Sequence, residues 1–291
     1  ENNVTQSAWE IEIASSRKDL EKGNNIWSSG KRESEQQVNV RPDVAILEKG
    51  SLYWWRLRIW DGKGQVTSWS EPASFSLGLN TSDWKAKWIT SVWKQGGPMP
   101  YFRKEFNTEK TGTQLQRAVV YFCGLGCGDL YLNGRLVDKK RILDPAQTNY
   151  EQYALYSTFD ITSGLVKGEN CLGVMLGEGW YGQDKVWGDW AKYGDPLFRL
   201  QMEITYEDGS KETIVSDESW QWIPGPVLKG NIYAGEVYDA TKEIKDWSKA
   251  GILADNWNEA VLAESNIPID LYPQLIEPIR LKNEIKAVKK W

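Results

Sequence analysis

The chain has 291 residues, which at about 100–200 residues per domain is enough for two domains. Its 35 Lys and Arg against 40 Asp and Glu give a mild net charge of −5, so nucleic acid is not expected as a partner. The absence of His excludes a Ser-His-Asp triad and a His-ligated zinc site within this chain. Its three Cys residues cannot form a disulfide framework, and no apolar run is long enough to span a membrane.

Residues 1–79 predict a small all-β domain. Residues 8–14 alternate apolar and acidic side chains, which is the period of a half-buried strand. In residues 53–60 one face is apolar, and the other carries Trp54, Arg56, Arg58 and Trp60, which suits stacking of guanidinium groups on indoles. After a turn at residues 61–64, residues 73–77 read as a closing strand. This pattern is typical of an Ig or fibronectin-III-like sandwich.

Residues 80–265 predict a larger β-sandwich of the jelly-roll type, resembling galactose-binding folds. Asn133-Gly134 is the strongest hairpin signal, residues 207–209 give a second hairpin, and residues 161–166 could make one helical turn. Residues 266–291 are interpreted as a linker or the start of a following domain, so we expect the chain to be part of a longer protein. Residues 84–89 open this unit, and strand-like segments span residues 101–106, 117–123, 129–132, 156–160, 171–176, 197–206, 211–216 and 277–285.

Acidic residues precede tryptophan at several places, as in Asp83-Trp84 and Asp246-Trp247, and more loosely in Asp217 and Trp220. The spacing between these pairs is irregular, so they are not the period of a repeat protein. We expect the carboxylates to cap backbone N–H groups where the chain enters a strand and the indoles to anchor the core.

The densest cluster of candidate functional residues is the Gly-rich loop 177–190. Aromatic faces beside carboxylates suit a sugar, because C–H faces lie on indoles while hydroxyl groups bond to the acids. The same acids could hold Ca²⁺, which takes about six to eight oxygen ligands. Packing in the core or between domains is the alternative role of the aromatic side chains. The candidate residues are Glu178, Trp180, Tyr181, Asp184, Trp187, Asp189 and Trp190.

A second polar loop, residues 143–153, offers further oxygen ligands at Asp144 and Asn149. The alternative for this loop is ordinary turn chemistry at Asp144-Pro145 and solvated side chains elsewhere. The Gly-rich segment 124–128 lies between two strands without a following helix, so it is not expected to cradle a phosphate. Two carboxylates roughly 5–10 Å apart could serve a glycosidase, but 40 acidic residues make that pattern unspecific.

An ordered series of motifs resembles the amino-terminal region of bacterial α-L-rhamnosidases of glycoside hydrolase family 78. Residues 53–61 and 69–70 resemble the fibronectin-III-like domain that often precedes that region. The matching segments of the larger domain are residues 84–89, 100–106, 124–126, 130–134, 156–162, 176–181, 232–240 and 278–280.

The resemblance implies that catalysis, hydrolysis of α-L-rhamnosides with inversion, belongs to an (α/α)₆ barrel that follows this region in the family. We therefore predict that this chain is inactive alone and helps to recognise rhamnose-containing glycans, with Ca²⁺ as a possible cofactor. The alternative is that it only braces the barrel and binds no sugar. An enzyme in its own right and a receptor or adhesion protein are further alternatives. The expected partners are a rhamnosyl glycan and the other domains of its parent chain, and family habit places it in the periplasm, at the cell surface or outside the cell.

Overall fold

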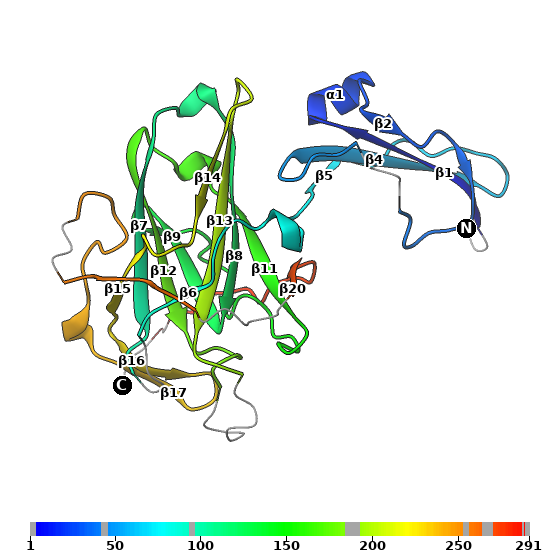
Figure 1. The fold of residues 1–291 in the computed structure, drawn as a ribbon. Coiled ribbons are helices and arrows are strands. Elements are labelled where there is room, and N and C mark those ends of the chain that lie inside the picture. Colours follow the sequence, from blue (N-terminus) through cyan, green and yellow to red (C-terminus); the bar gives the residue numbers. More distant parts are fainter. Residues whose placement is uncertain are drawn as a thin grey trace. The chain divides into compact units, whose positions relative to one another are not determined.

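The computed structural model describes residues 4–41, 46–92, 97–183, 193–252, 256–263, 270–286 and 288. The chain divides into two compact units, Glu1–Gly78 and Leu79–Trp291, and each is described by itself. Both units are built from strands, as Figure 1 shows, so the all-β prediction is confirmed. No helix among these residues is long and apolar enough to cross a membrane.

The smaller unit has a five-stranded sheet in the order β2-β1-β4-β5, with β3 paired to β1. A short helix, α1 (Arg17–Lys22), follows β1 because Ser16 caps the backbone N–H of Asp19 and Gly23 ends the helix with φ of 76°. The strands are β1 (Gln6–Ala14), β2 (Trp27–Ser28), β3 (Arg32–Glu33), β4 (Leu52–Asp61) and β5 (Ala73–Ser76).

On one face of this sheet the central charged side chains form ion pairs with one another. On β4 and β1, Arg56 bonds Glu12 and Arg58 bonds Glu10, both at 2.6 Å. Both guanidinium groups lie 4.5 Å from the centre of the Trp69 ring. The predicted stacking of Arg on Trp is confirmed for Arg58, which also lies 5.2 Å from the centre of the Trp60 ring, whereas Trp69 was not part of the prediction. The opposite face builds the core of the unit around Ile13, Tyr53, Trp55 and Phe75.

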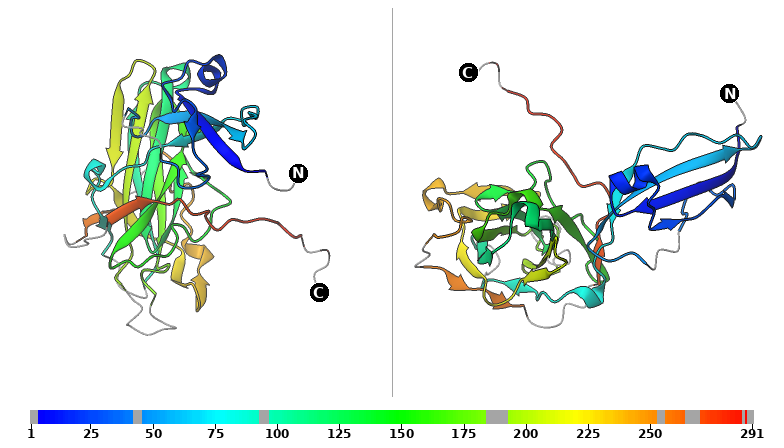
Figure 2. Two further views of the ribbon diagram at one scale, coloured as in Figure 1. Left: turned by 90° about the vertical axis from the view of Figure 1, so that its right-hand side faces the viewer. Right: turned by 90° about the horizontal axis from the view of Figure 1, so that it is seen from above.

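The larger unit is a sandwich of two sheets, seen from two further sides in Figure 2. The six-stranded sheet has the order β10-β9-β12-β7-β15-β18. The seven-stranded sheet has the order β19-β6-β13-β8-β11-β20, with β14 paired to β13. The strands β16 and β17 form a separate hairpin. Their bounds are β6 (Ile89–Thr90), β7 (Pro100–Thr108), β8 (Leu115–Leu125), β9 (Cys127–Leu132), β10 (Arg135–Leu136), β11 (Tyr153–Asp160), β12 (Gly168–Gly177), β13 (Leu197–Tyr206), β14 (Lys211–Val215), β15 (Gln221–Pro224), β16 (Val227–Asn231), β17 (Gly235–Tyr238), β18 (Asn258–Glu259), β19 (Val261–Leu262) and β20 (Asp270–Pro273).

Alternate residues of the strands build two apolar layers. Between the sheets, Val120 and Phe122 of β8 pack with Leu172 and Val174 of β12 and with the fully buried Trp220. On the outer face of the seven-stranded sheet, a second cluster includes Val119, Tyr121, Trp84 and Tyr156. Burial on both faces explains why this unit uses so many large aromatic side chains.

Two of the acid-tryptophan pairs act as predicted, whereas the carboxylate of Asp246 pairs with the side chain of Lys249 at 2.7 Å. Asp83 accepts a hydrogen bond from the backbone of Asn80 at 2.7 Å, and Asp217 accepts one from Ser219 at 3.0 Å. The following indoles of Trp84 and Trp220 are buried.

Residues 84–89 open the larger unit: Ile89 enters β6, and Trp84 and Ala86 pack on the outer face of the seven-stranded sheet. The strand predicted at residues 277–285 is wrong. Of residues 277–285, only Arg280 pairs, in an isolated bridge with Arg141. Residues 266–291 also contain β20, which runs parallel to β11. The helical turn appears as the 3₁₀ turn Thr162–Gly164.

Candidate functional site

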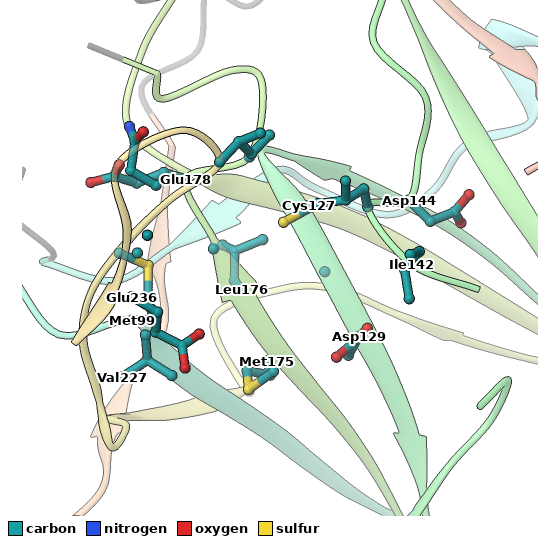
Figure 3. A pocket seen from close by; sticks show the side chains of 18 residues that line it. Met99, Cys127, Asp129, Ile142, Asp144, Met175, Leu176, Glu178, Val227 and Glu236 are labelled. Atoms are coloured by element: carbon teal, nitrogen blue, oxygen red, sulfur yellow. The ribbon is translucent and has the colours of Figure 1, made fainter. Parts of the chain in front are cut away.

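The larger unit contains a cavity of about 360 Å³ beside the six-stranded sheet (Figure 3). Its lining comes from the start of β9, the loop at residues 142–144, the end of β12 with the loop that follows, Met99, and the β16–β17 hairpin. The hairpin is tied to the sandwich where the backbone N–H of Met99 donates to the carbonyl of Val227 at 2.7 Å. Segments far apart in sequence thus meet around one space.

Two glycines fix the turn that carries Glu178. Gly126 has φ of 116°, and a Cβ there would lie 2.1 Å from the carbonyl oxygen of Gly177. Gly179 has φ of 49°, and a Cβ there would lie 2.2 Å from the carbonyl carbon of Gly126. The turns before β9 and after β12 therefore approach at a distance that only glycine allows. This contact is the structural role of the Gly-rich segment 124–128.

Four carboxylic acids line the cavity: Asp129, Asp144, Glu178 and Glu236. Asp144 and Glu178 are buried, Asp129 is partly buried and Glu236 is exposed. No Lys or Arg is among the described residues that line the cavity. The site is therefore acidic.

Asp144 is held by several partners. Its carboxylate pairs with Arg141 at 3.2 Å and accepts hydrogen bonds from the Ser157 hydroxyl and from the Gln274 amide, the latter at 3.3 Å. Its backbone carbonyl accepts from the N–H of Gly128 at 3.2 Å, which ties the loop to β9. These contacts make Asp144 a fixed part of the cavity wall.

Asp129 differs because its carboxylate has no hydrogen bond or ion pair within the described part of the chain. Burial raises the pKa of this carboxyl above its usual value of 3.8, and the nearby charge of Asp144 adds to the rise. A partly buried acid that lines a cavity with a perturbed pKa and without an internal partner is a candidate ligand-binding group.

The remaining wall is mostly apolar. Met99, Met175, Leu176, Val227 and Ile232 supply aliphatic and thioether surface. Cys127 also lines the cavity, and burial raises the pKa of its thiol to about 12, so it stays neutral and is not a nucleophile. A few acids among apolar groups can orient a small ligand that has both hydroxyl and apolar surfaces.

The structure brings together two of the nine predicted site residues, because Asp144 and Glu178 line the same cavity. Trp180 contacts Tyr233, with ring centres 6.0 Å apart, and Tyr181 is buried against Tyr150. Asn149 is exposed, and its side chain accepts from the backbone of Glu151 within a turn. The other four, Asp184, Trp187, Asp189 and Trp190, lie outside the described residues.

Four residues of the cavity were not predicted from the sequence: Asp129, Glu236, Met99 and Met175. Alternation along β9 places Leu130 and Leu132 in the core and Asp129 on the opposite face. This alternation of side chains along the strand can be read from the sequence. The hairpin that partly covers this face comes about 100 residues later in the chain, and no local pattern predicts its position.

Among the described residues there is no group of three or more His, Cys, Asp or Glu side chains that could hold a metal ion. Because Ca²⁺ also takes backbone and amide oxygens, calcium stays a prediction. Two of the predicted ligands, Asp184 and Asp189, lie outside the described residues.

Comparisons with known proteins agree on one family. Residues 113–283 match the family described as Alpha-L-rhamnosidase N-terminal domain, and residues 1–81 match the Rha78A-like, N-terminal immunoglobulin domain. An α-L-rhamnosidase of Formosa agariphila is 35% identical over 287 residues, which cover 88% of this chain and 30% of that protein.

Solved structures show the same relationship. The structure of an α-L-rhamnosidase from Dictyoglumus thermophilum is 36% identical, with a TM-score of 0.86, and the match covers 100% of this chain and 34% of that chain. The α-L-rhamnosidase of Streptomyces avermitilis, solved in complex with L-rhamnose, shares the fold at 20% identity and a TM-score of 0.84, over 96% of this chain and 43% of that one. The chain spans about a third of the length of the curated relatives that it matches.

Proposed function

Because this chain belongs to the α-L-rhamnosidase N-terminal domain family, we propose that its larger unit binds a terminal L-rhamnosyl residue of a glycan. The observation that carries the proposal is the cavity, which joins carboxylates and apolar side chains from five segments of the chain. L-Rhamnose has hydroxyl groups that can donate to carboxylates and a methyl group at C6 that suits thioether and aliphatic surface. The relative solved with L-rhamnose makes this sugar the first ligand to test.

We place the hydrolysis of the rhamnosidic bond in the rest of the parent polypeptide. The relatives are about three times longer than the matched region. Within the described residues, the longest helix is the six-residue α1, so these residues contain no helical barrel. The cavity would hold one terminal rhamnosyl residue of a glycan while another domain acts elsewhere on the same glycan. Localisation outside the cytoplasm and the exclusion of nucleic acid stay predictions.

Calorimetric titration of the chain with L-rhamnose tests the proposal. Millimolar to high-micromolar affinity, about −4 to −6 kcal/mol, is expected for a single sugar in such a site. A blocking variant is Gly230→Leu, since a Cβ at Gly230 meets Val227 at 3.6 Å and Met99 at 3.9 Å without a backbone clash.

The matched control is Lys229→Leu, which adds the same side chain at an exposed neighbouring position outside the cavity lining. The proposal expects saturable heat in the wild type and in the control, and none in the blocked variant. Equal affinity in all three would show that the sugar, if it binds, does not use this cavity.

A second candidate function, bracing of another domain, is favoured by the apolar side chains along residues 275–285. Leu275 is 91% exposed and Ile285 is 93% exposed, while Ile276, Ile279 and Leu281 are half exposed. Such a surface usually has a partner. In a bracing role the chain alone should self-associate in sedimentation experiments, and Leu275→Ser with Ile276→Ser should reduce that association. A strictly monomeric wild type would remove this support.

A further inference from the structure

We propose that the cavity admits uncharged sugars and excludes sugars that carry a carboxylate, and that Asp129 is the residue that determines this choice. The inference rests on the proposed function, because it concerns the selectivity of the same cavity. It adds the chemical class of ligand and a specificity-determining residue that lies in neither predicted loop.

The first support is the arrangement of charge around the cavity. Figure 3 shows Asp129 and Asp144 on one side and Glu178 and Glu236 on the other. The Asp144 carboxylate is held by Arg141 and Ser157, so Asp129 is the acid on its side that has no partner among the described residues. An anionic ligand would need a cation to balance its charge, and none of the described lining residues is Lys or Arg.

The second support is that Arg141, the residue before Ile142 of the cavity lining, already has a partner. Arg141 pairs with Asp144 at 3.2 Å, and the two side chains are only 12% and 9% exposed. The Arg141 guanidinium also lies 5.0 Å from the centre of the Phe159 ring. The charge of Arg141 is therefore balanced by Asp144, and the guanidinium is not free to pair with a ligand carboxylate.

The third support is the state of Asp129. Its carboxylate makes no hydrogen bond or ion pair with other described residues, although it is partly buried beside Asp144. A sugar hydroxyl could donate to it and supply the missing partner. A ligand carboxylate could not donate and would add a like charge in a partly dehydrated site, where charges at about 5 Å repel strongly.

The test compares three sugars that share one ring and differ only at C6. L-Rhamnose has a methyl group there, L-mannose has a hydroxymethyl group, and L-mannuronate has a carboxylate. Their dissociation constants are measured by calorimetry at pH 7 for the wild type and for Asp129→Asn, which removes the charge with little change of shape. The control is Glu259→Gln on β18, an exposed acid on the same sheet that does not line the cavity.

For the wild type we expect L-mannuronate to bind at least about tenfold more weakly than L-rhamnose, with L-mannose between them. Asp129→Asn should narrow the ratio of L-rhamnose to L-mannuronate by about fivefold or more, and Glu259→Gln should leave it unchanged. The ratio in the wild type alone tests the exclusion of anionic sugars, even if the variant does not fold.

Binding of L-rhamnose together with equal binding of L-mannuronate would overturn the inference and leave the proposed function intact. An unchanged ratio in Asp129→Asn would remove Asp129 as the determinant. If L-rhamnose does not bind to the wild type at all, the proposed function fails and the inference fails with it.

Discussion

The polar face of the smaller unit and the cavity of the larger unit use charge in opposite ways. On the first, Glu10 and Glu12 each hold an Arg at 2.6 Å, and Trp69 lies under both guanidinium groups. In the second, four acids face one space and the described lining has no cation. The first arrangement satisfies its central charges within the protein, whereas the second leaves the Asp129 carboxylate without a hydrogen bond or ion pair to any described residue.

The contrast separates structural charges from functional ones. A paired surface charge has low potential to bind anything else, whereas a partly buried acid without a partner is maintained at a cost to the stability of the fold. The cavity contains one acid of each kind: Asp144 is paired within the protein, and Asp129 has no partner among the described residues. Stability measurements on single variants can therefore distinguish the two roles.

The largest effect is expected for Asp144→Ala. This change leaves the buried guanidinium of Arg141 without its partner, so the free energy of unfolding should fall by about 3 kcal/mol. Urea unfolding followed by circular dichroism measures the loss. Adding Arg141→Met to the same variant removes the unpaired charge and should recover part of the stability. A double variant as unstable as the single one would show that the ion pair is not the cause.

A smaller loss is expected for Trp69→Ala in the smaller unit. The indole contacts the guanidinium groups of both Arg56 and Arg58, and each contact contributes about 0.5–1 kcal/mol at a partly exposed site. The free energy of unfolding of this unit should therefore fall by about 1–2 kcal/mol. Trp69→Phe keeps an aromatic face and should lose less stability than Trp69→Ala. Equal free energies of unfolding for the two variants would argue against the ring interaction.

Asp129→Asn should stabilise the fold, in contrast to the two variants above. Removing a partly buried, unpaired charge should raise the free energy of unfolding by about 1 kcal/mol at pH 7. A loss of stability in this variant would mean that the carboxylate is satisfied within the fold, which would contradict its assignment as a ligand-binding group.

The pH dependence gives a second test of Asp129. Because its pKa is raised in the folded chain, the folded state holds this proton more tightly than the unfolded state does. Stability therefore falls as the pH rises from the ordinary value of 3.8 through the raised value, and the full penalty is present above it. The advantage of Asp129→Asn should disappear at low pH, where the Asp129 carboxyl is itself protonated and neutral. An advantage that is constant with pH would contradict this account.

The smallest effect is expected for Lys87→Gln. Lys87 and Glu218 form an exposed pair at 3.2 Å, and such pairs contribute little. The free energy of unfolding should change by less than about 0.5 kcal/mol, which sets the reference for the other variants.

The strands could be predicted where the alternation of side chains is strong, as in β1, β4, β8 and β13. Short strands such as β18 and β19 were missed, since two residues carry no period. Residues 277–285 alternate apolar and polar side chains as a strand does, but only Arg280 pairs, in an isolated bridge. The period of a segment does not determine the hydrogen-bond partners of its backbone.

Only those residues of the candidate site that belong to a local sequence motif were predicted. Glu178 and Asp144 belong to polar loops that can be recognised from composition. Asp129 lies within a regular strand, and its importance depends on Met99 and on a hairpin about 100 residues later. Contacts of that range follow from the topology, which a single sequence does not determine.

The most direct measurement of the central claim uses the three methionines of the chain. Met99 and Met175 line the cavity, while Met202 is fully buried between the two sheets. Carbon-13 labelling of the methionine methyl groups therefore gives three NMR signals, two at the site and one internal control. If L-rhamnose binds in the cavity, titration with this sugar should shift the Met99 and Met175 signals saturably and leave the Met202 signal constant. Constant signals from Met99 and Met175 at saturating sugar would contradict binding in this cavity.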